Sequence, residues 1–215
     1  MGRKEQAYQY IKDAIMTNKL RAGSPVREMD IAEELKMSRT PVREAMRDLE
    51  AEGLVISYTS RGAFVSSITP YDVEEIGQLR ELIEVWCLER GFNRITDEEL
   101  DYIENEFKKA KESNSWELNH KADRLLHQLI IDKAGSKRTT QFMNNLNTQI
   151  ERIRRVSAKH VGRSEMSYDE HMEIIKSIRS RDLEKSKAEL IKHLRSVGDS
   201  AIDAARTIDL DSPLG

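Results

Sequence analysis

The chain has 215 residues, of which 34% are charged and 38% hydrophobic, and its formal net charge is −3. This composition excludes a disordered chain, because enough apolar side chains are present to bury a core. The lone Cys87 excludes an internal disulfide and a thiolate metal cluster, and a single thiol fits a reducing cytoplasm. The N-terminus lacks an apolar signal segment, and no run approaches the ~20 apolar residues of a membrane span. We therefore expect a cytoplasmic protein without a membrane partner.

Two short helices are predicted at the start of the chain. Residues 3–17 and 28–36 carry apolar side chains at helical spacing, and an Ala-Gly-Ser-Pro turn at 22–25 separates them. A tight connection at residues 36–37 leads into a third helix. Two short helices joined to a third in this way are typical of a helix-turn-helix.

The third helix is predicted to begin at Ser38, whose hydroxyl can cap the N-terminus, and to end at Gly53. Its apolar residues Val42, Ala45 and Leu49 form one inward face. Hydroxyl and guanidinium groups on the other side suit phosphates and guanine edges, although a solvated basic face is an equally good interpretation of this helix alone. These polar residues are Ser38, Arg39, Thr40, Arg43 and Arg47.

A hairpin is predicted directly after this helix, with strands at 54–57 and 63–66. Arg61 and Gly62 lie at its tip, where an arginine can enter a minor groove, although an ordinary polar tip is the simpler interpretation. The first 70 residues hold 11 basic and 10 acidic side chains. DNA binding would therefore depend on where the charges lie, and on two copies acting together, more than on bulk charge.

These motifs resemble the winged helix of the GntR family of bacterial transcription regulators. The resemblance rests on the run from Ser38 to Ala45, on Glu52-Gly53-Leu54 and on Arg61-Gly62. It implies DNA contacts at Ser38, Arg39, Thr40, Arg43 and the wing residues Thr59 to Gly62. Met29 occupies a position that is often arginine in the family.

The remainder of the chain is predicted to be an antiparallel bundle of about six helices, which makes the fold class mainly α. We expect domain 1–69 to be the winged helix-turn-helix, domain 70–206 to be the all-helical effector domain, and 207–215 to be a loose tail. A short connector joins the two domains at residues 66–70. The helices are expected at residues 71–91, 96–111, 115–134, 136–160, 165–179 and 181–206. On the first of them Ile76, Leu79, Leu82, Ile83 and Trp86 are expected to face inward, and the run from Thr96 to Glu99 is expected to cap the second.

Four polar residues fall on the apolar faces of three of these helices. Asp123 and His127 are four residues apart, and His171 and His193 each accompany isoleucine, leucine or valine. A single histidine on such a face is more often a hydrogen-bonded core residue. One aspartate and three histidines together favour a divalent metal site, with zinc, nickel and manganese as the candidate ions.

Residues 72–205 resemble the FCD effector domain of the FadR branch of the GntR family. Asp123, His127, the pair Glu170-His171, and His193 match the metal motif of that domain. Their presence argues against the acyl-CoA type of effector domain, which lacks these ligands.

Arg80 shares a helical face with Ile76, Ile83 and Cys87, where a charge is costly unless it is paired. It can form an internal ion pair with Glu84 or clamp a carboxylate effector, and the resemblance implies the clamp. Arg155 is a weaker candidate for a second effector contact, because the run from Arg152 to Arg155 is typical of a solvated face.

The sequence therefore predicts a non-enzymatic, homodimeric transcription regulator. We expect it to be a repressor, because repression that a ligand relieves is commoner than activation. It would bind a double-stranded DNA operator and respond to a small organic acid held near the metal. The alternatives are a metal-dependent enzyme in the bundle and a constitutive DNA-binding protein whose metal is purely structural.

Overall fold

The computed structural model describes residues 2–158 and 163–210 of the chain. They fall into two compact units, one from residues 2–69 with 145–152 and the other from residues 70–144 with 153–158 and 163–210. In the described ranges, no helix is both long enough and apolar enough to cross a membrane. Each unit is described separately below.

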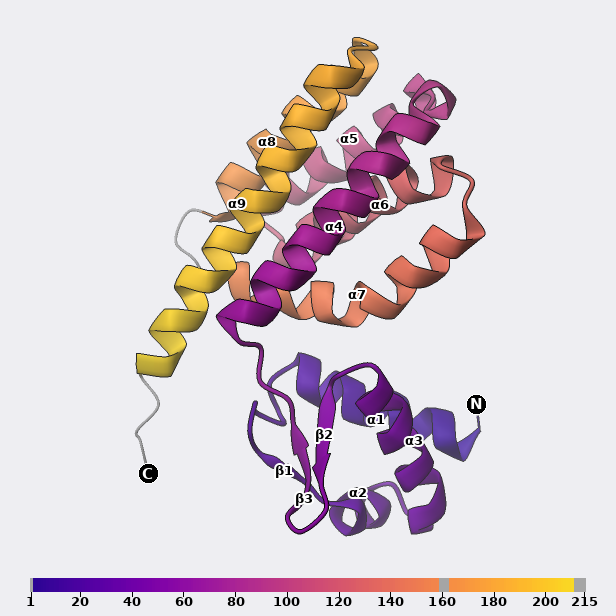
Figure 1. Ribbon diagram of the computed structural model, residues 1–215, viewed down its shortest axis with the longest axis vertical. Helices are drawn as coiled ribbons and strands as arrows, with labels where there is room; N and C mark the ends of the chain where they lie inside the picture. The colour runs from indigo at the N-terminus through magenta and orange to yellow at the C-terminus, as the bar shows by residue number, and fades with distance from the viewer. Residues whose placement is uncertain (1, 159–162, 211–215) are drawn as a thin grey trace. The chain divides into compact units, whose positions relative to one another are not determined.

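The first unit is a winged helix-turn-helix (Figure 1). Its strands form a small antiparallel sheet in the order β1-β3-β2, in which Val55 pairs with Val65 and Tyr58 pairs with Gly62. The hairpin of β2 and β3 is the predicted wing. The elements in chain order are α1 (Arg3–Met16), β1 (Pro25–Val26), α2 (Glu28–Glu34), α3 (Arg39–Ala51), β2 (Val55–Tyr58) and β3 (Gly62–Val65).

The predicted inward face of α3 is confirmed, since Val42, Ala45, Met46 and Leu49 are all buried and pack with residues of α1 and the sheet. Gly53 ends the helix with a left-handed φ of 71°, which a side chain would strain. The amide of Leu54 then donates to the carbonyl of Leu49 at 2.9 Å, as in a Schellman motif. Ser38 occupies the N-cap position as expected, but its hydroxyl makes no capping hydrogen bond.

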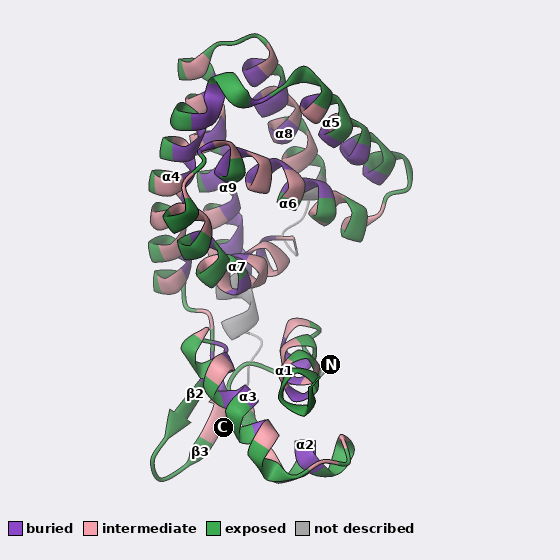
Figure 2. Ribbon diagram, turned by 90° about the vertical axis from the view of Figure 1, so that its right-hand side faces the viewer, coloured by how far each residue is buried: buried purple, intermediate pink, exposed green. Residues whose placement is uncertain are grey.

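The second unit is all-helical, and its buried residues line the inward sides of the helices (Figure 2). Helix α4 packs against α6 and α9, α5 packs against α6 and α8, and α8 packs against α9. The expected cap of α5 is present as a reciprocal pair of hydrogen bonds between Thr96 and Glu99. The helices are α4 (Pro70–Gly91), the short η1 (Phe92–Arg94), α5 (Asp97–Glu112), α6 (Trp116–Lys133), α7 (Lys137–Ser157), α8 (Arg163–Arg179) and α9 (Leu183–Leu210). Residues 145–152 of α7 are the part of this helix that belongs to the first unit.

The orientation of α4 differs from the sequence prediction. Leu82 and Trp86 were expected to face inward but are 70% and 43% exposed, whereas Arg80 and Glu84 are 4% and 0% exposed. The helix is apolar on more than one side, so its periodicity alone does not define the buried face. The buried face is instead the one whose two charges can pair with each other and with the centre of the bundle.

Two helix ends also differ from expectation. Helix α9 continues to Leu210, so residues 207–210 are helical where a loose tail was expected, and the rest of that expected tail, 211–215, lies outside the described residues. Backbone hydrogen bonds extend a helix without needing an apolar pattern, which is why the fading pattern placed the end too early. Helix α7 ends at Ser157, with Ala158 as its C-cap, and the rest of the range expected for it lies outside the described residues.

Candidate metal centre and DNA-binding surface

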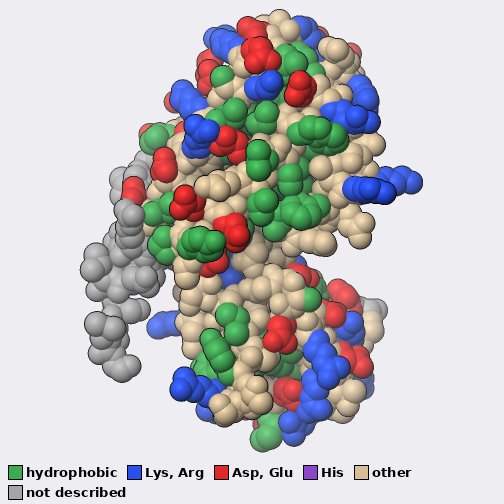
Figure 3. Space-filling view, viewed as in Figure 1, with side chains coloured by type: hydrophobic (Ala, Val, Ile, Leu, Met, Phe, Trp, Pro, Cys, Tyr) green, Lys and Arg blue, Asp and Glu red, His purple; other side chains and the backbone are tan. Residues whose placement is uncertain are grey.

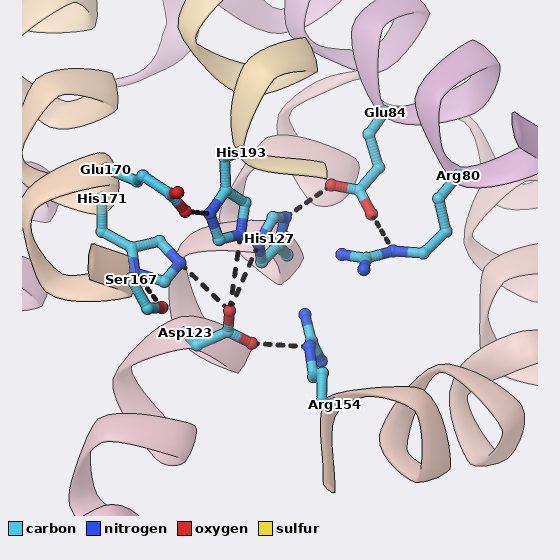
Figure 4. A network of polar contacts seen from close by, with 9 residues as sticks. All are labelled: Arg80, Glu84, Asp123, His127, Arg154, Ser167, Glu170, His171 and His193. Carbon is cyan, nitrogen blue, oxygen red and sulfur yellow. Dashed lines mark hydrogen bonds and ion pairs between the residues drawn. The ribbon is translucent and has the colours of Figure 1, made fainter. Parts of the chain in front are cut away.

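The four candidate metal ligands meet inside the helical bundle (Figure 4). Asp123 and His127 come from α6, His171 from α8 and His193 from α9, and all four are buried. One ligand atom from each lies within 4.8 Å of the others. The Oδ1 atom of Asp123 is 3.0 Å from the Nε2 atom of His171 and 3.5 Å from that of His127. The four-residue spacing on α6 places its two ligands on one side of this point.

Each histidine in the cluster is held through the ring nitrogen that faces away from Asp123. The Nδ1 atom of His127 is 2.5 Å from a Glu84 oxygen, and that of His193 is 2.8 Å from a Glu170 oxygen. A carboxylate only accepts, so Nδ1 donates in both rings, which leaves Nε2 as the nitrogen of each ring that can face a metal. The Nε2 atoms therefore point at the shared centre, the position from which a histidine can bind a metal.

Buried charges set the electrostatics of this centre. The pKa of Glu84 falls to about 2, because Arg80 and His127 outweigh the opposing effect of burial. Arg154 and His127 similarly hold the pKa of Asp123 well below its usual range against burial. Burial and the neighbouring His171 lower the pKa of His193 to about 3, so this ring is neutral. Ionised carboxylates beside a neutral imidazole are a donor set suited to a divalent cation.

Arg80 forms the internal ion pair considered for it and keeps one buried nitrogen without a hydrogen-bond partner among the described residues. Its Nε atom donates to Glu84 at 2.9 Å, which is the internal ion pair. Its Nη2 atom is buried and has no hydrogen-bond partner among the described residues. Figure 4 shows the guanidinium groups of Arg80 and Arg154 both reaching into the site, from α4 and α7. An unsatisfied buried donor costs ~1–3 kcal/mol, which an anion seated between the two arginines would relieve.

The sequence prediction missed Arg154 and Glu84 as residues of the site. The Nε atom of Arg154 lies 2.7 Å from the Oδ2 atom of Asp123. Arg155, which was predicted instead, stacks over the ring of Trp116 at 5.0 Å. The four-residue spacing of Arg80 and Glu84 was the one available signal for Glu84, and no sequence signal separated Arg154 from its neighbours.

A cavity of about 50 Å³ lies beside the metal centre. Arg154 lines it, whereas Arg80 and Arg155 do not. The Ser157 hydroxyl also lines it and is buried without a hydrogen-bond partner among the described residues. The rings of Trp116 and His120 stack in parallel at one wall, with centroids 5.0 Å apart. The lining residues are Trp116, Asn119, His120, Asp123, Arg154, Ser157, Ala158, Ser167 and Val197.

The structure exposes every residue predicted to contact DNA. A groove of about 810 Å³ runs between α3 and the wing, and Arg39, Arg43, Arg47, Arg61 and Gly62 line it. Gly62 has a φ of 85°, so glycine suits the turn that returns the chain into β3. The exposed set comprises Ser38, Arg39, Thr40, Arg43, Arg47, Thr59, Arg61 and Gly62.

One acidic side chain lies among these cations. Glu28, at the start of α2, accepts from Arg43 at 2.8 and 2.9 Å and from Arg39 at 3.1 Å. Hydrogen bonds from Arg43 are the main reason that the pKa of Glu28 is lowered.

Comparison with known proteins agrees with both halves of the structure. The chain is 25% identical over 199 residues to the HTH-type transcriptional repressor RspR of Escherichia coli K12, covering 91% of this chain and 87% of the relative. The Zn²⁺-bound FCD domain of TM0439 is 28% identical, with a TM-score of 0.60, and covers 66% of this chain and 99% of its own. A regulator from Rhodococcus sp. RHA1, 22% identical, shares the fold over 95% of this chain and 99% of its own, with a TM-score of 0.75.

Two family models match the chain. Residues 3–65 match the gntR family of bacterial regulatory proteins, and residues 75–196 match the FCD domain. The chain therefore belongs to the GntR family of bacterial transcription regulators and carries an FCD domain.

Proposed function

We propose that this regulator is a repressor whose affinity for its operator is controlled by a small carboxylate bound beside a divalent metal in the FCD domain. The observation that carries the proposal is the buried centre of one aspartate and three histidines, flanked by two arginines. The name of the relative RspR supports the repressing sense. The Zn²⁺-bound state of TM0439 supports a metal at the corresponding domain.

The donor set fits a divalent metal ion. Asp123, His127, His171 and His193 would hold it, and the outward bonds to Glu84 and Glu170 already orient two of the rings. Zinc, nickel and manganese are the candidate ions. An ion that accepts six ligands would keep positions for effector oxygens, whereas tetrahedral zinc would be filled by the four protein ligands. The metal would supply a positive contact for one oxygen of the acid.

The charge of the site favours an anionic ligand. The site holds three carboxylates, from Glu84, Asp123 and Glu170, and two guanidinium groups, from Arg80 and Arg154. These groups leave one negative charge in excess, and a divalent ion reverses the excess to one positive charge. A monoanionic acid would then neutralise the site, with Arg80 and Arg154 as the contacts for its carboxylate. Arg155 would not contact the acid directly but would hold Trp116, which lines the cavity, in place.

Chain connectivity provides a route from the acid to the winged helix. Arg80 and Glu84 lie on α4, which begins at Pro70, and four residues separate it from the end of β3 at Val65. An acid that binds one arrangement of α4 more tightly shifts the population toward that arrangement. By linkage, the same free energy then changes operator affinity.

The acting form is a symmetric homodimer on a near-palindromic operator. A winged helix of nearly balanced charge gains affinity from a second copy, and two copies match the two halves of such a site. Figure 3 shows hydrophobic side chains gathered on the face where α4 and α9 run, and Leu82 and Trp86 are exposed on α4. We place the two-fold contact there. Trp86→Glu should yield a folded monomer in sedimentation velocity, and an unchanged dimer would show that the two-fold contact lies elsewhere.

The whole proposal is tested with an operator recovered by selection from a random duplex library. Affinity for that duplex is measured by fluorescence anisotropy with the metal-free protein, the metal-loaded protein and a panel of small mono- and dicarboxylic acids. We expect at least one acid to weaken the complex only when metal is bound. If no acid changes operator affinity or the melting temperature, the metal is structural and the regulation by acid is refuted.

A further inference from the structure

The groove that faces DNA contains a carboxylate in the middle of its cations. Glu28 is the partner of both Arg39 and Arg43, and its side chain is 22% exposed while theirs are 56% and 52% exposed. Arg47 and Arg61 line the same groove. A negative charge here opposes the attraction of DNA phosphates, so its position requires an account.

The hydrogen bonds to Glu28 fix the orientation of the Arg43 guanidinium group and determine which of its N–H groups can contact DNA. Its Nε and Nη2 atoms both donate to Glu28, so the guanidinium plane is held by two parallel bonds. The Nη1 atom and the second Nη2 hydrogen take no part in these bonds. Arg39 donates to the Glu28 oxygen that Arg43 Nη2 also uses. Two arginines and one carboxylate thus form a cluster with a single net positive charge.

We infer that Glu28 determines DNA specificity by positioning Arg39 and Arg43 and by weakening their attraction to phosphates. A phosphate that approaches either arginine meets the nearby carboxylate and must compete with it for the same N–H groups. A guanine edge is a neutral acceptor and suffers much less repulsion, while it gains from an arginine that is already oriented. Glu28 therefore reduces non-specific affinity more than operator affinity.

This inference rests on the proposed operator binding and is tested on the full-length protein with Glu28→Gln. Glutamine keeps the length of the side chain and an acceptor oxygen but removes the charge. Glu33→Gln is the matched control, because Glu33 is an exposed acid on the same helix and is not among the residues lining the groove. The probes are the operator duplex selected by the wild type and a random duplex of equal length.

Two shifts are expected in Glu28→Gln alone. One extra phosphate contact per winged helix steepens the salt dependence of random-duplex binding by about 0.9, or about 1.8 for two copies. Between about 50 and about 200 mM salt, this slope corresponds to an about 12-fold larger loss of affinity. The ratio of random-duplex Kd to operator Kd at the higher salt should fall by about fivefold or more.

The outcomes distinguish this inference from the proposed function. If the wild type enriches no duplex, operator binding itself fails. If the wild type enriches an operator and Glu28→Gln keeps the wild-type salt slope and Kd ratio, the role of Glu28 is refuted. Equal weakening on both duplexes with an unchanged slope, or the same shifts in Glu33→Gln, would also refute it.

Discussion

Replacing Glu84 by glutamine tests whether the metal centre depends on the buried charge of Glu84, which links Arg80 to His127. Glu84 is fully buried, accepts from Arg80 at 2.9 Å and lies 2.5 Å from the Nδ1 atom of His127. Glutamine has the same shape but no charge. The substitution therefore leaves the guanidinium of Arg80 buried without its counter-ion and weakens the bond that orients His127.

The structure sets the expected size of both effects. Removing one partner of a buried ion pair costs ~3–5 kcal/mol. For a chain of this length, that is a decrease in Tm of about 6–20 °C. Removing a carboxylate that orients a metal-ligating histidine typically lowers metal affinity by about 10- to 100-fold. Glu84→Gln should therefore lower both the Tm of the metal-free protein and its affinity for metal.

The assay combines thermal unfolding of the metal-free protein with a competitive metal titration. Glu81→Gln is the control, because Glu81 lies on the same helix and pairs with the exposed Arg195, a pair worth ~0–1 kcal/mol. The double variant Arg80→Met/Glu84→Gln should regain at least about 1 kcal/mol, since no buried charge then lacks its partner. If Glu84→Gln keeps the wild-type Tm and the wild-type metal affinity, the charge of Glu84 does not support the metal centre.

Three further predictions address the metal, the DNA and the acid. His193→Ala should lower bound metal measured by elemental analysis, and full occupancy would remove this residue from the ligand set. Arg43→Ala should weaken operator binding by ~1–3 kcal/mol if it pairs with guanine, without changing the fold by circular dichroism; unchanged affinity would refute the contact. Arg154→Gln, loaded with metal, should retain operator binding but lower the acid response by about tenfold, and a normal response in the anisotropy assay would contradict the proposed carboxylate contact.

Amphipathic helices were the part of the fold that could be read from the sequence. The period of Val42, Ala45 and Leu49 identifies their buried side because the opposite side of α3 is polar. The convergence of Asp123 and His127 with His171 and His193 was also foreseeable, since polar groups on apolar faces of packed helices meet in the core.

The remaining features depend on tertiary packing. Leu82 and Trp86 were placed inward because they are apolar, but α4 buries an ion pair and exposes both of them. Arg154 and Arg155 are adjacent in the sequence and about 100° apart around α7, so composition cannot decide which one reaches Asp123. Pairing between Glu28 and Arg43 joins two helices, and no local pattern records it.

The outward anchoring of the imidazoles has a consequence for how the cell would use this protein. Two of the rings are held by Glu84 and Glu170 independently of any ion, so the folded chain presents its ligands before a metal arrives. The folded protein can then exist with or without the metal, and the concentration of available metal determines the occupied fraction. Under the proposed function, a shortage of metal would raise the concentration of acid needed to release the operator. One protein would then respond both to the metal and to the acid.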